Sequence, residues 1–439
     1  MATPVQSDSA SPTVGASGSE PYHKALILLA SLFFMWGFIT VINNTLLPHL
    51  RSVFELSYFQ TTLIESTWFI GYLLASIPAA KLIERIGYQR ALVVGLAVMT
   101  FGSLLMVPAA RIPSYEVTLV ALFTVACGIA LLQVAANPYV AVIGPPETSE
   151  SRLTLVQAFN TTGDVLAIIF GKYLILNRTT GGTTLGGGNL THAERMADAQ
   201  ATQLPYMIVA AVLAVLAVLI WRAKLPALSD STRRHNAEER KKHSLFSHRN
   251  LIFGCGAIAL CVFAEISVSS LFINFASQPS VANITNEDAA FYLAFFWGGM
   301  MVGRFLGAWI MRYIAAEKVL AWYALGAIAC ALVAVFVPGP IAMYALMVTG
   351  LFISIMFPTI FALAIRGLGP LTEEGSGLLI MSIAGGALVF IQGRMADSYG
   401  LNWSFLLTAL CCLYVWFFAV WGSKPTHVLP PEKLEPVGE

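Results

Sequence analysis

The chain has 439 residues, 57% of them hydrophobic and only 11% charged, and its mean hydropathy is +0.73. A soluble protein has about a quarter of its residues charged, so most of this protein's surface must face lipid. The net charge of +1 argues against a nucleic-acid partner, which would need a basic face. Because open sheet edges cannot exist in the hydrocarbon layer, the composition predicts an all-α membrane protein in direct contact with the lipid bilayer.

Twelve apolar segments are long enough to cross a bilayer as helices, which takes about 20 residues each. We expect these transmembrane helices at residues 25–48, 58–81, 91–110, 116–143, 152–177, 204–222, 250–276, 289–312, 319–337, 340–365, 375–396 and 401–422. The first residues are rich in Ser, Pro and Gly, and we expect no cleavable signal peptide there.

A charged segment divides the spans into two sets of six. The predicted organisation is a disordered cytoplasmic N-terminus at 1–24, an N-terminal six-helix half at 25–223, a cytoplasmic linker at 224–249, a C-terminal six-helix half at 250–423 and a cytoplasmic tail at 424–439. The halves repeat weakly: KLIERIGYQRAL (81–92) aligns with WIMRYIAAEKVL (309–320), and Pro138 aligns with Pro358. Two parallel-repeat halves of six helices are typical of the major facilitator fold.

Lysine and arginine predict the orientation. Eight of them lie in 222–249 and three more flank the loop between the second and third spans, whereas the loops after spans seven and nine carry none. Because cytoplasmic loops are enriched in these residues, we expect the linker and both termini in the cytoplasm. The expected location is the bacterial inner (plasma) membrane, with multiple passes.

Amide side chains recur in the first, fourth and fifth spans, where polar groups are costly. They are spaced i, i+4 in the fourth span and i, i+3, i+7 in the fifth, where the stripe ends at Asp164, so each set shares a helical face. A single buried amide is most often a bridge between packed helices. Three stripes in one half also supply donors and acceptors for sugar hydroxyls, with aromatic rings for the sugar's apolar face. The candidate substrate-binding residues are Trp36, Asn43, Asn44, Gln133, Asn137, Gln157, Asn160 and Trp297.

Three carboxylates within the predicted spans are candidates for ion coupling: Glu65, Asp164 and Glu265. An unpaired charge at the bilayer centre costs at least about 2.5–3.5 kcal/mol. Asp164 and Glu265 are predicted near mid-depth, where a proton or cation relay would lie, and Glu65 in the outer half of the second span. For Arg304, in the eighth span, we expect a structural ion pair with one of these acids.

No pattern of catalytic or metal-ligating residues is apparent. The six cysteines fall in apolar runs without metal-ligand spacing, and the seven histidines fall in predicted loops or the tail. We therefore expect neither an enzyme nor a metal site, and no cofactor beyond H+ or Na+ as a coupling ion.

Five segments resemble the fucose–galactose–glucose/proton symporter family of the major facilitator superfamily. They are SLFFMWGFITVINNTLLPHL (31–50), LLQVAANPYVAVIGP (131–145), SRLTLVQAFNTTGD (151–164), MFPTIFALAIRGLG (356–369) and the stretch 375–400. The LQVAANPY and LVQAFN runs are similar to the glucose/galactose branch. The resemblance implies hexose import, with Gln133, Asn137, Gln157 and Asn160 lining the sugar site.

The chain departs from that family at the positions of its proton carriers. The family's first span has an acid where this chain has Asn44, and its fucose branch has a second acid where this chain has Gln133. An amide cannot titrate, so two interpretations remain: a passive facilitator, or a symporter whose carrier has moved to Glu65 or Asp164. The loss of both acids favours the facilitator. The same fold is also compatible with a drug exporter or a sugar sensor, and we expect the protein to work as a monomer.

Overall fold

The computed structural model describes residues 19–54, 58–111, 114–174, 203–223, 225–226, 238–240 and 242–430. Within these helices, the side chains of 19–22, 42–66, 110 and 168–174 lie outside the description. The first helix begins at Ser19, so the last residues of the segment expected to be disordered are helical.

The described part of the N-terminal half is a bundle of six helices. They are α1 (Ser19–Phe54), α2 (Tyr58–Ile86), α3 (Tyr88–Arg111), α4 (Tyr115–Val142), α5 (Ser149–Leu174) and α7 (Gln203–Arg222). These helices pack closely because glycines let two backbones approach. A Cβ on Gly37 of α1 would lie 2.8 Å from the Asn160 amide nitrogen of α5, and one on Gly163 of α5 would lie 3.0 Å from the backbone nitrogen of Phe38.

The C-terminal half has the same plan, but three of its six spans are interrupted. Its continuous helices are α9 (Arg249–Ala276), α10 (Asn286–Ile310) and α11 (Ala316–Phe336). The interrupted spans are α12 (Pro340–Ile353) with α13 (Met356–Ile365), α14 (Thr372–Met381) with the 3₁₀ segment η6 (Ser382–Leu388) and α15 (Val389–Tyr399), and α16 (Leu401–Phe417) with the π-helical turn η7 (Phe418–Gly422). Mid-helix 3₁₀ segments and π-turns often mark functional or strained positions.

The prediction of twelve spans in an all-α fold is confirmed. Ten helical segments of the described chain are long and apolar enough to cross a membrane. The other two spans are α2 and α5, which are as long as the rest but carry more polar residues.

Polar side chains satisfy the carbonyls left open where two helices end. At the end of α4, Arg152 donates to the carbonyls of Val140 (3.2 Å) and Ala141 (2.7 Å). At the end of α13, Asn250 donates to the carbonyls of Leu363 (3.2 Å) and Ala364 (2.9 Å). Because terminal helix carbonyls have no intrahelical partner, these bonds stabilise both helix ends.

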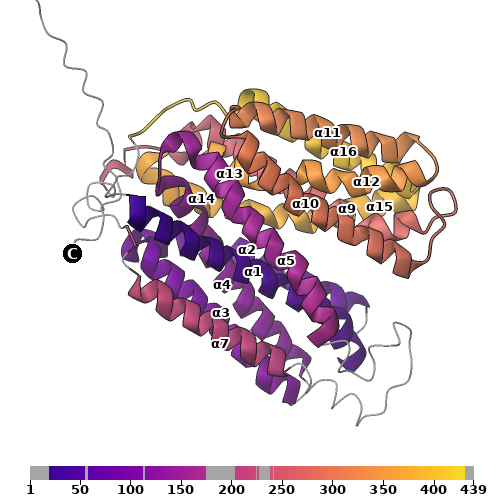
Figure 1. The fold of residues 1–439 in the computed structure, drawn as a ribbon, viewed down its shortest axis with the longest axis horizontal. Coiled ribbons are helices and arrows are strands. Elements are labelled where there is room, and N and C mark those ends of the chain that lie inside the picture. Colours follow the sequence, from indigo (N-terminus) through magenta and orange to yellow (C-terminus); the bar gives the residue numbers. More distant parts are fainter. Residues whose placement is uncertain are drawn as a thin grey trace, which may run out of the picture.

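The two halves meet at one end of the bundle, which we call the linker end because it carries residues 238–240 and 242–248 of the linker (Figure 1). There Arg366 of the C-terminal half binds Glu150 of the N-terminal half (2.5 Å) and Glu317 of its own half (2.5 Å). Toward the opposite end, the indigo-to-magenta helices and the orange-to-yellow helices spread apart.

The linker itself contributes to this closure. Arg240 lies between the halves and binds Glu84 of α2 (3.1 Å) and Glu373 of α14 (2.9 Å). It also donates to the carbonyl of Pro370 (2.6 Å). The linker end is therefore closed by ion pairs that cross from one half to the other.

Candidate functional site

Four amide side chains of α4 and α5 are buried, with at most 8% of their surface exposed. Gln133 donates to the Tyr72 hydroxyl of α2 (2.6 Å), and Gln157 donates to the side-chain oxygen of Asn137 (3.2 Å). Among the described residues, the Oε1 of Gln133 and the Nδ2 of Asn137 have no hydrogen-bond partner. A buried polar atom without a hydrogen-bond partner is energetically costly. The Gln133 Oε1 is therefore available to accept a hydrogen bond from a ligand, and the Asn137 Nδ2 to donate one; we call these atoms the open acceptor and the open donor.

The fourth amide joins the first helix to this group. Asn160 donates to the Phe33 carbonyl of α1 (2.9 Å), and Trp36 of α1 is buried with its ring centroid 5.3 Å from that of Phe33. The glycine at position 37 makes room for both Asn160 and Asp164, because a Cβ there would lie 2.8 Å from the Oδ1 of Asp164. Asn160 thus acts as the helix bridge that amides commonly form.

Two prolines near this site each leave a backbone carbonyl without its intrahelical hydrogen bond. Proline lacks the N–H that would donate to the carbonyl four residues earlier. Pro138 frees the carbonyl of Val134, which accepts from Ser376 of the opposite half (2.9 Å). Pro358 frees the carbonyl of Ser354, which accepts from the Nε of Arg304 (3.0 Å). The equivalent prolines of the two halves therefore each anchor a side chain from another helix.

Arg304 of α10 is the charged residue that links the halves at the site, and 6% of its surface is exposed. Its Nη1 donates to the Gln157 carbonyl of α5 (3.0 Å) and to the Thr161 hydroxyl. Asp164 and Glu265 both interact with it electrostatically. The expected ion pair is therefore wrong in detail: among the described residues, Arg304 binds carbonyls and a hydroxyl, with both acids nearby but beyond ion-pair distance.

Four of the predicted residues are not among those described in this cluster. The side chains of Asn43, Asn44 and Glu65 lie outside the described residues. Trp297 packs with Phe296 (5.4 Å between ring centroids) against a hydrophobic cluster of the C-terminal half. That cluster contains the end of α9 and the start of α10, away from the linker end.

Two partners of the site were missed in the sequence. Tyr72 was not predicted to bind Gln133, and Ser376 was not predicted to bind the Val134 carbonyl. A freed carbonyl four residues before a span proline is a sequence signal that some donor must be near. The sequence does not say which helix supplies that donor, since Ser376 lies 242 residues from Val134.

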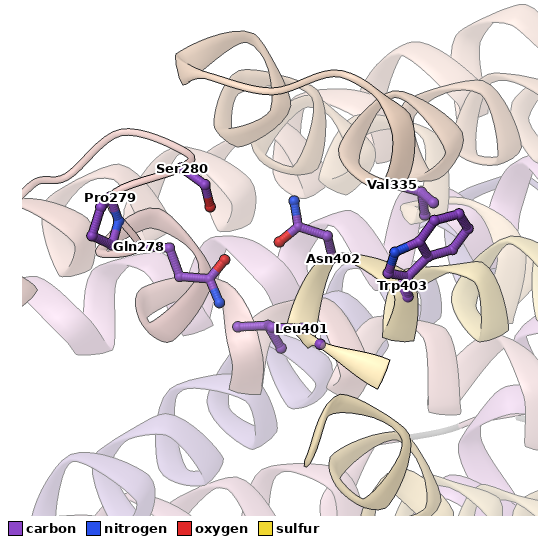
Figure 2. Close-up of a pocket in the computed structure, with 8 residues that line it drawn as sticks. Gln278, Pro279, Ser280, Val335, Leu401, Asn402 and Trp403 are labelled. Carbon is purple, nitrogen blue, oxygen red and sulfur yellow. The ribbon is translucent and has the colours of Figure 1, made fainter. Parts of the chain in front are cut away.

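A pocket of about 520 Å³ lies elsewhere, at the end of the C-terminal half that is opposite the linker end (Figure 2). Gln278 and Ser280 line it from the loop after α9, and Asn402 and Trp403 line it from the start of α16. It is a shallow surface hollow remote from the amides. In the described chain, no group of three or more His, Cys, Asp or Glu residues is arranged to hold a metal ion.

Two six-helix halves, joined around buried polar residues and closed at one end, define a membrane carrier. The family model described as the Major Facilitator Superfamily matches residues 27–390. The chain belongs to this superfamily and, within it, to the fucose–galactose–glucose/proton symporter family that its motifs resemble. It is a transporter and not an enzyme.

The similar proteins cover nearly the whole chain. A glucose/galactose transporter of Brucella abortus is 44% identical over 93% of this chain and 96% of its own length. A putative glucose/galactose transporter of Helicobacter pylori is 40% identical over 91% of this chain and 97% of its own length. The L-fucose-proton symporter of Escherichia coli is 34% identical over 93% of this chain and 95% of its own length.

Solved structures agree with the fold. A crystal structure of the transporter FucP in the outward conformation has a TM-score of 0.84 and 33% identity, and the match covers 92% of this chain and 100% of that one. A proton:xylose symporter has a TM-score of 0.66 at 13% identity over 94% of this chain and 98% of that one, which supports the fold alone.

Proposed function

We propose that the protein carries a hexose, glucose or galactose, across the bacterial inner membrane by alternating access. The observation that carries this proposal is the open acceptor on Gln133 and the open donor on Asn137, buried beside Gln157 where the halves join. Sugar hydroxyls both donate and accept, so they can satisfy the two atoms together. The names of the relatives from Brucella abortus and Helicobacter pylori point to the same substrates.

Alternating access also fits the closed linker end. The ion pairs of Arg366 and Arg240 join the halves at the linker end, so we expect a substrate to reach the amides from the opposite end. Opening those ion pairs and closing the opposite end would release the sugar at the linker end, by rocking of one half against the other. The protein works as a monomer, since both halves of the site come from one chain.

The test of this function is counterflow in proteoliposomes. Vesicles loaded with unlabelled D-glucose or D-galactose should take up the labelled sugar transiently above its outside concentration, without any ion gradient. A protein that binds the sugar but gives no overshoot is a sensor. Overshoot for apolar drugs but not for sugars indicates an exporter. Either result would contradict the proposal.

The orientation is tested separately with thiol labelling. The proposed topology places the linker end and both termini in the cytoplasm. Asn283 is exposed between α9 and α10, and Lys242 is exposed at the linker end. In intact cells, an impermeant maleimide should label the Asn283→Cys variant and spare the Lys242→Cys variant. The reverse pattern would invert the topology.

A further inference from the structure

Three charged side chains interact electrostatically where the halves join: Asp164 of α5, Glu265 of α9 and Arg304 of α10. With both carboxylates ionised their charges sum to −1, because arginine stays protonated in proteins and supplies a single positive charge. A net charge inside the membrane is costly and is normally paired. The cluster therefore lacks one positive charge.

Arg304 does not satisfy either acid by hydrogen bonding. Its nitrogens donate to Ser354, Gln157 and Thr161. Among the described residues, neither carboxylate accepts a hydrogen bond, and both side chains are only partly buried. The acids thus remain open to a ligand that can donate or coordinate, and the missing charge makes that ligand a cation.

The two acids differ in how they would respond to transport. Glu265 and Arg304 both belong to the C-terminal half, so rocking of the halves leaves them together. Asp164 belongs to the N-terminal half, where its Oδ1 lies close to Gly37 of α1, and it interacts electrostatically with Arg304 of the other half. Its distance from Arg304 is therefore the one that changes, and its need for a compensating cation changes with it.

Asp164 is also connected to the buried amides through residues of its own helix. Thr161 and Gln157, which Arg304 holds, precede it on the same face of α5. The side chain of Gln157 in turn binds Asn137, whose Nδ2 is open. A shift of Arg304 relative to α5 would therefore act on the cation and on the sugar-binding amides at once.

The geometry points to Asp164, backed by the Glu265–Arg304 pair, as the binding site of one monovalent cation, H+ or Na+, whose occupancy is coupled to hexose. This inference rests on the proposed hexose transport. Among the described side chains of the helices packed on α5, which are α1, α4, α10 and α13, Arg304 is the charged group that interacts with Asp164, and Glu265 of α9 interacts with both. The cation-carrying role lost at Asn44 and Gln133 is thereby moved to α5, which favours the symporter over the facilitator.

For a proton, the carboxylate of Asp164 takes up H+ on the side from which sugar enters and releases it on the other side. For Na+, the carboxylate oxygens coordinate the ion, with no bond broken. Both reactions cancel the surplus charge while the halves move. The two ions are distinguished by which gradient drives sugar uptake.

The experiment compares two readouts in proteoliposomes with D-glucose and D-galactose: counterflow, which needs no gradient, and accumulation under a tenfold inward gradient of H+ or of Na+. For one cation per sugar, the wild-type protein should accumulate sugar up to about tenfold, because the two gradients then balance in free energy. The Asp164→Asn variant should still show counterflow, but under either gradient the sugar concentration inside should only equal that outside. Asp397→Asn, at an exposed acid of α15, is the matched control and should behave as wild type.

The outcomes separate the two proposals. Wild-type protein without counterflow overturns the hexose function itself. Counterflow without accumulation under either gradient overturns the cation site and leaves the function intact. If the Asp164→Asn variant accumulates as much sugar as the wild type, the cation does not bind at Asp164 and the assignment of the site is wrong.

A second variant covers the case in which Asp164→Asn does not fold. The double variant Glu265→Gln/Arg304→Gln keeps Asp164 and the net charge of −1. Unlike Arg304→Ala, which leaves two carboxylates without a positive charge, it has an unchanged net charge and an amide donor at position 304. It should therefore still accumulate sugar under the gradient that drives the wild type, at a lower rate because contacts to α5 are weakened. Counterflow without accumulation in the double variant would contradict the charge count.

Discussion

The two halves share a helical plan but use it differently. In the N-terminal half, α4 is continuous through Pro138, and its buried amides keep one donor and one acceptor open. In the C-terminal half, the equivalent span breaks before Pro358, and the freed carbonyl is taken by a charged residue. The two halves thus differ at equivalent prolines: the freed carbonyl of the N-terminal half accepts from a neutral serine, and that of the C-terminal half accepts from a charged arginine.

The contrast between the halves is tested most severely by removing Arg304. Arg304→Ala leaves Asp164 and Glu265 without a positive charge and the carbonyls of Ser354 and Gln157 without a donor. Deleting one member of a buried charge cluster costs about 3–5 kcal/mol, so we expect a large loss of thermal stability in detergent and loss of transport. If the Arg304→Ala variant has the thermal stability of the wild type, the charge cluster does not contribute to the stability of the fold.

The next effect concerns the neutral groups of the N-terminal half. Gln157→Ala removes a side chain that positions Asn137, and Gln133→Ala removes the open acceptor. Each loss should weaken sugar binding by about 1–3 kcal/mol, or roughly 5- to 150-fold, measured by equilibrium binding. Gln392 is the matched control, because it is also a buried amide with an open Oε1 but lies in the C-terminal half beside Ser404.

Gln392→Ala should leave sugar affinity unchanged. Equal losses of affinity in Gln392→Ala and Gln157→Ala would mean that buried amides matter only for packing, and the division between the halves would then fail.

A smaller effect is expected where the halves share a neutral hydrogen bond. Ser376→Ala removes the donor to the Val134 carbonyl freed by Pro138. A neutral hydrogen bond contributes about 1 kcal/mol, well below the cost expected for Arg304→Ala. Thermal unfolding of the two variants side by side measures the difference, and a Ser376→Ala loss as large as that of Arg304→Ala would remove the contrast between the two carbonyls.

The smallest effect is at the linker end. Arg366 is 43% exposed, so its pairs with Glu150 and Glu317 contribute less than about 1 kcal/mol. Arg366→Ala should therefore raise the open population by less than about fivefold. The labelling rate of a thiol introduced by Ser151→Cys, at a position buried against the Ala308 carbonyl, reports this opening. An unchanged rate would mean that the Arg366 ion pairs do not contribute to the closure.

Much of this architecture could be predicted from the sequence, because it depends on local patterns. Span length, the charged linker and the lysine and arginine asymmetry require only the chain itself. The spacing of Gln133 and Asn137 put them on one face, and both are buried in α4.

The partners of these residues could not be predicted, because they depend on how distant helices pack. Arg304 is 147 residues from the Gln157 carbonyl that it binds, and Tyr72 is 61 residues from Gln133. The 3₁₀ segment in the eleventh span was missed for the same reason. Gly385 and Gly386 pack against Ala259 of α9 and Phe69 of α2, so neighbouring helices decide the shape of that segment.

The most direct test of the central claim is an experimental structure with D-glucose or D-galactose bound. The proposed site predicts that sugar hydroxyls lie within hydrogen-bond distance of the Gln133 Oε1 and the Asn137 Nδ2, the two buried atoms that lack a partner. A sugar bound elsewhere, such as the surface pocket beside Gln278 and Asn402, with the two amide atoms still unpaired, would contradict it.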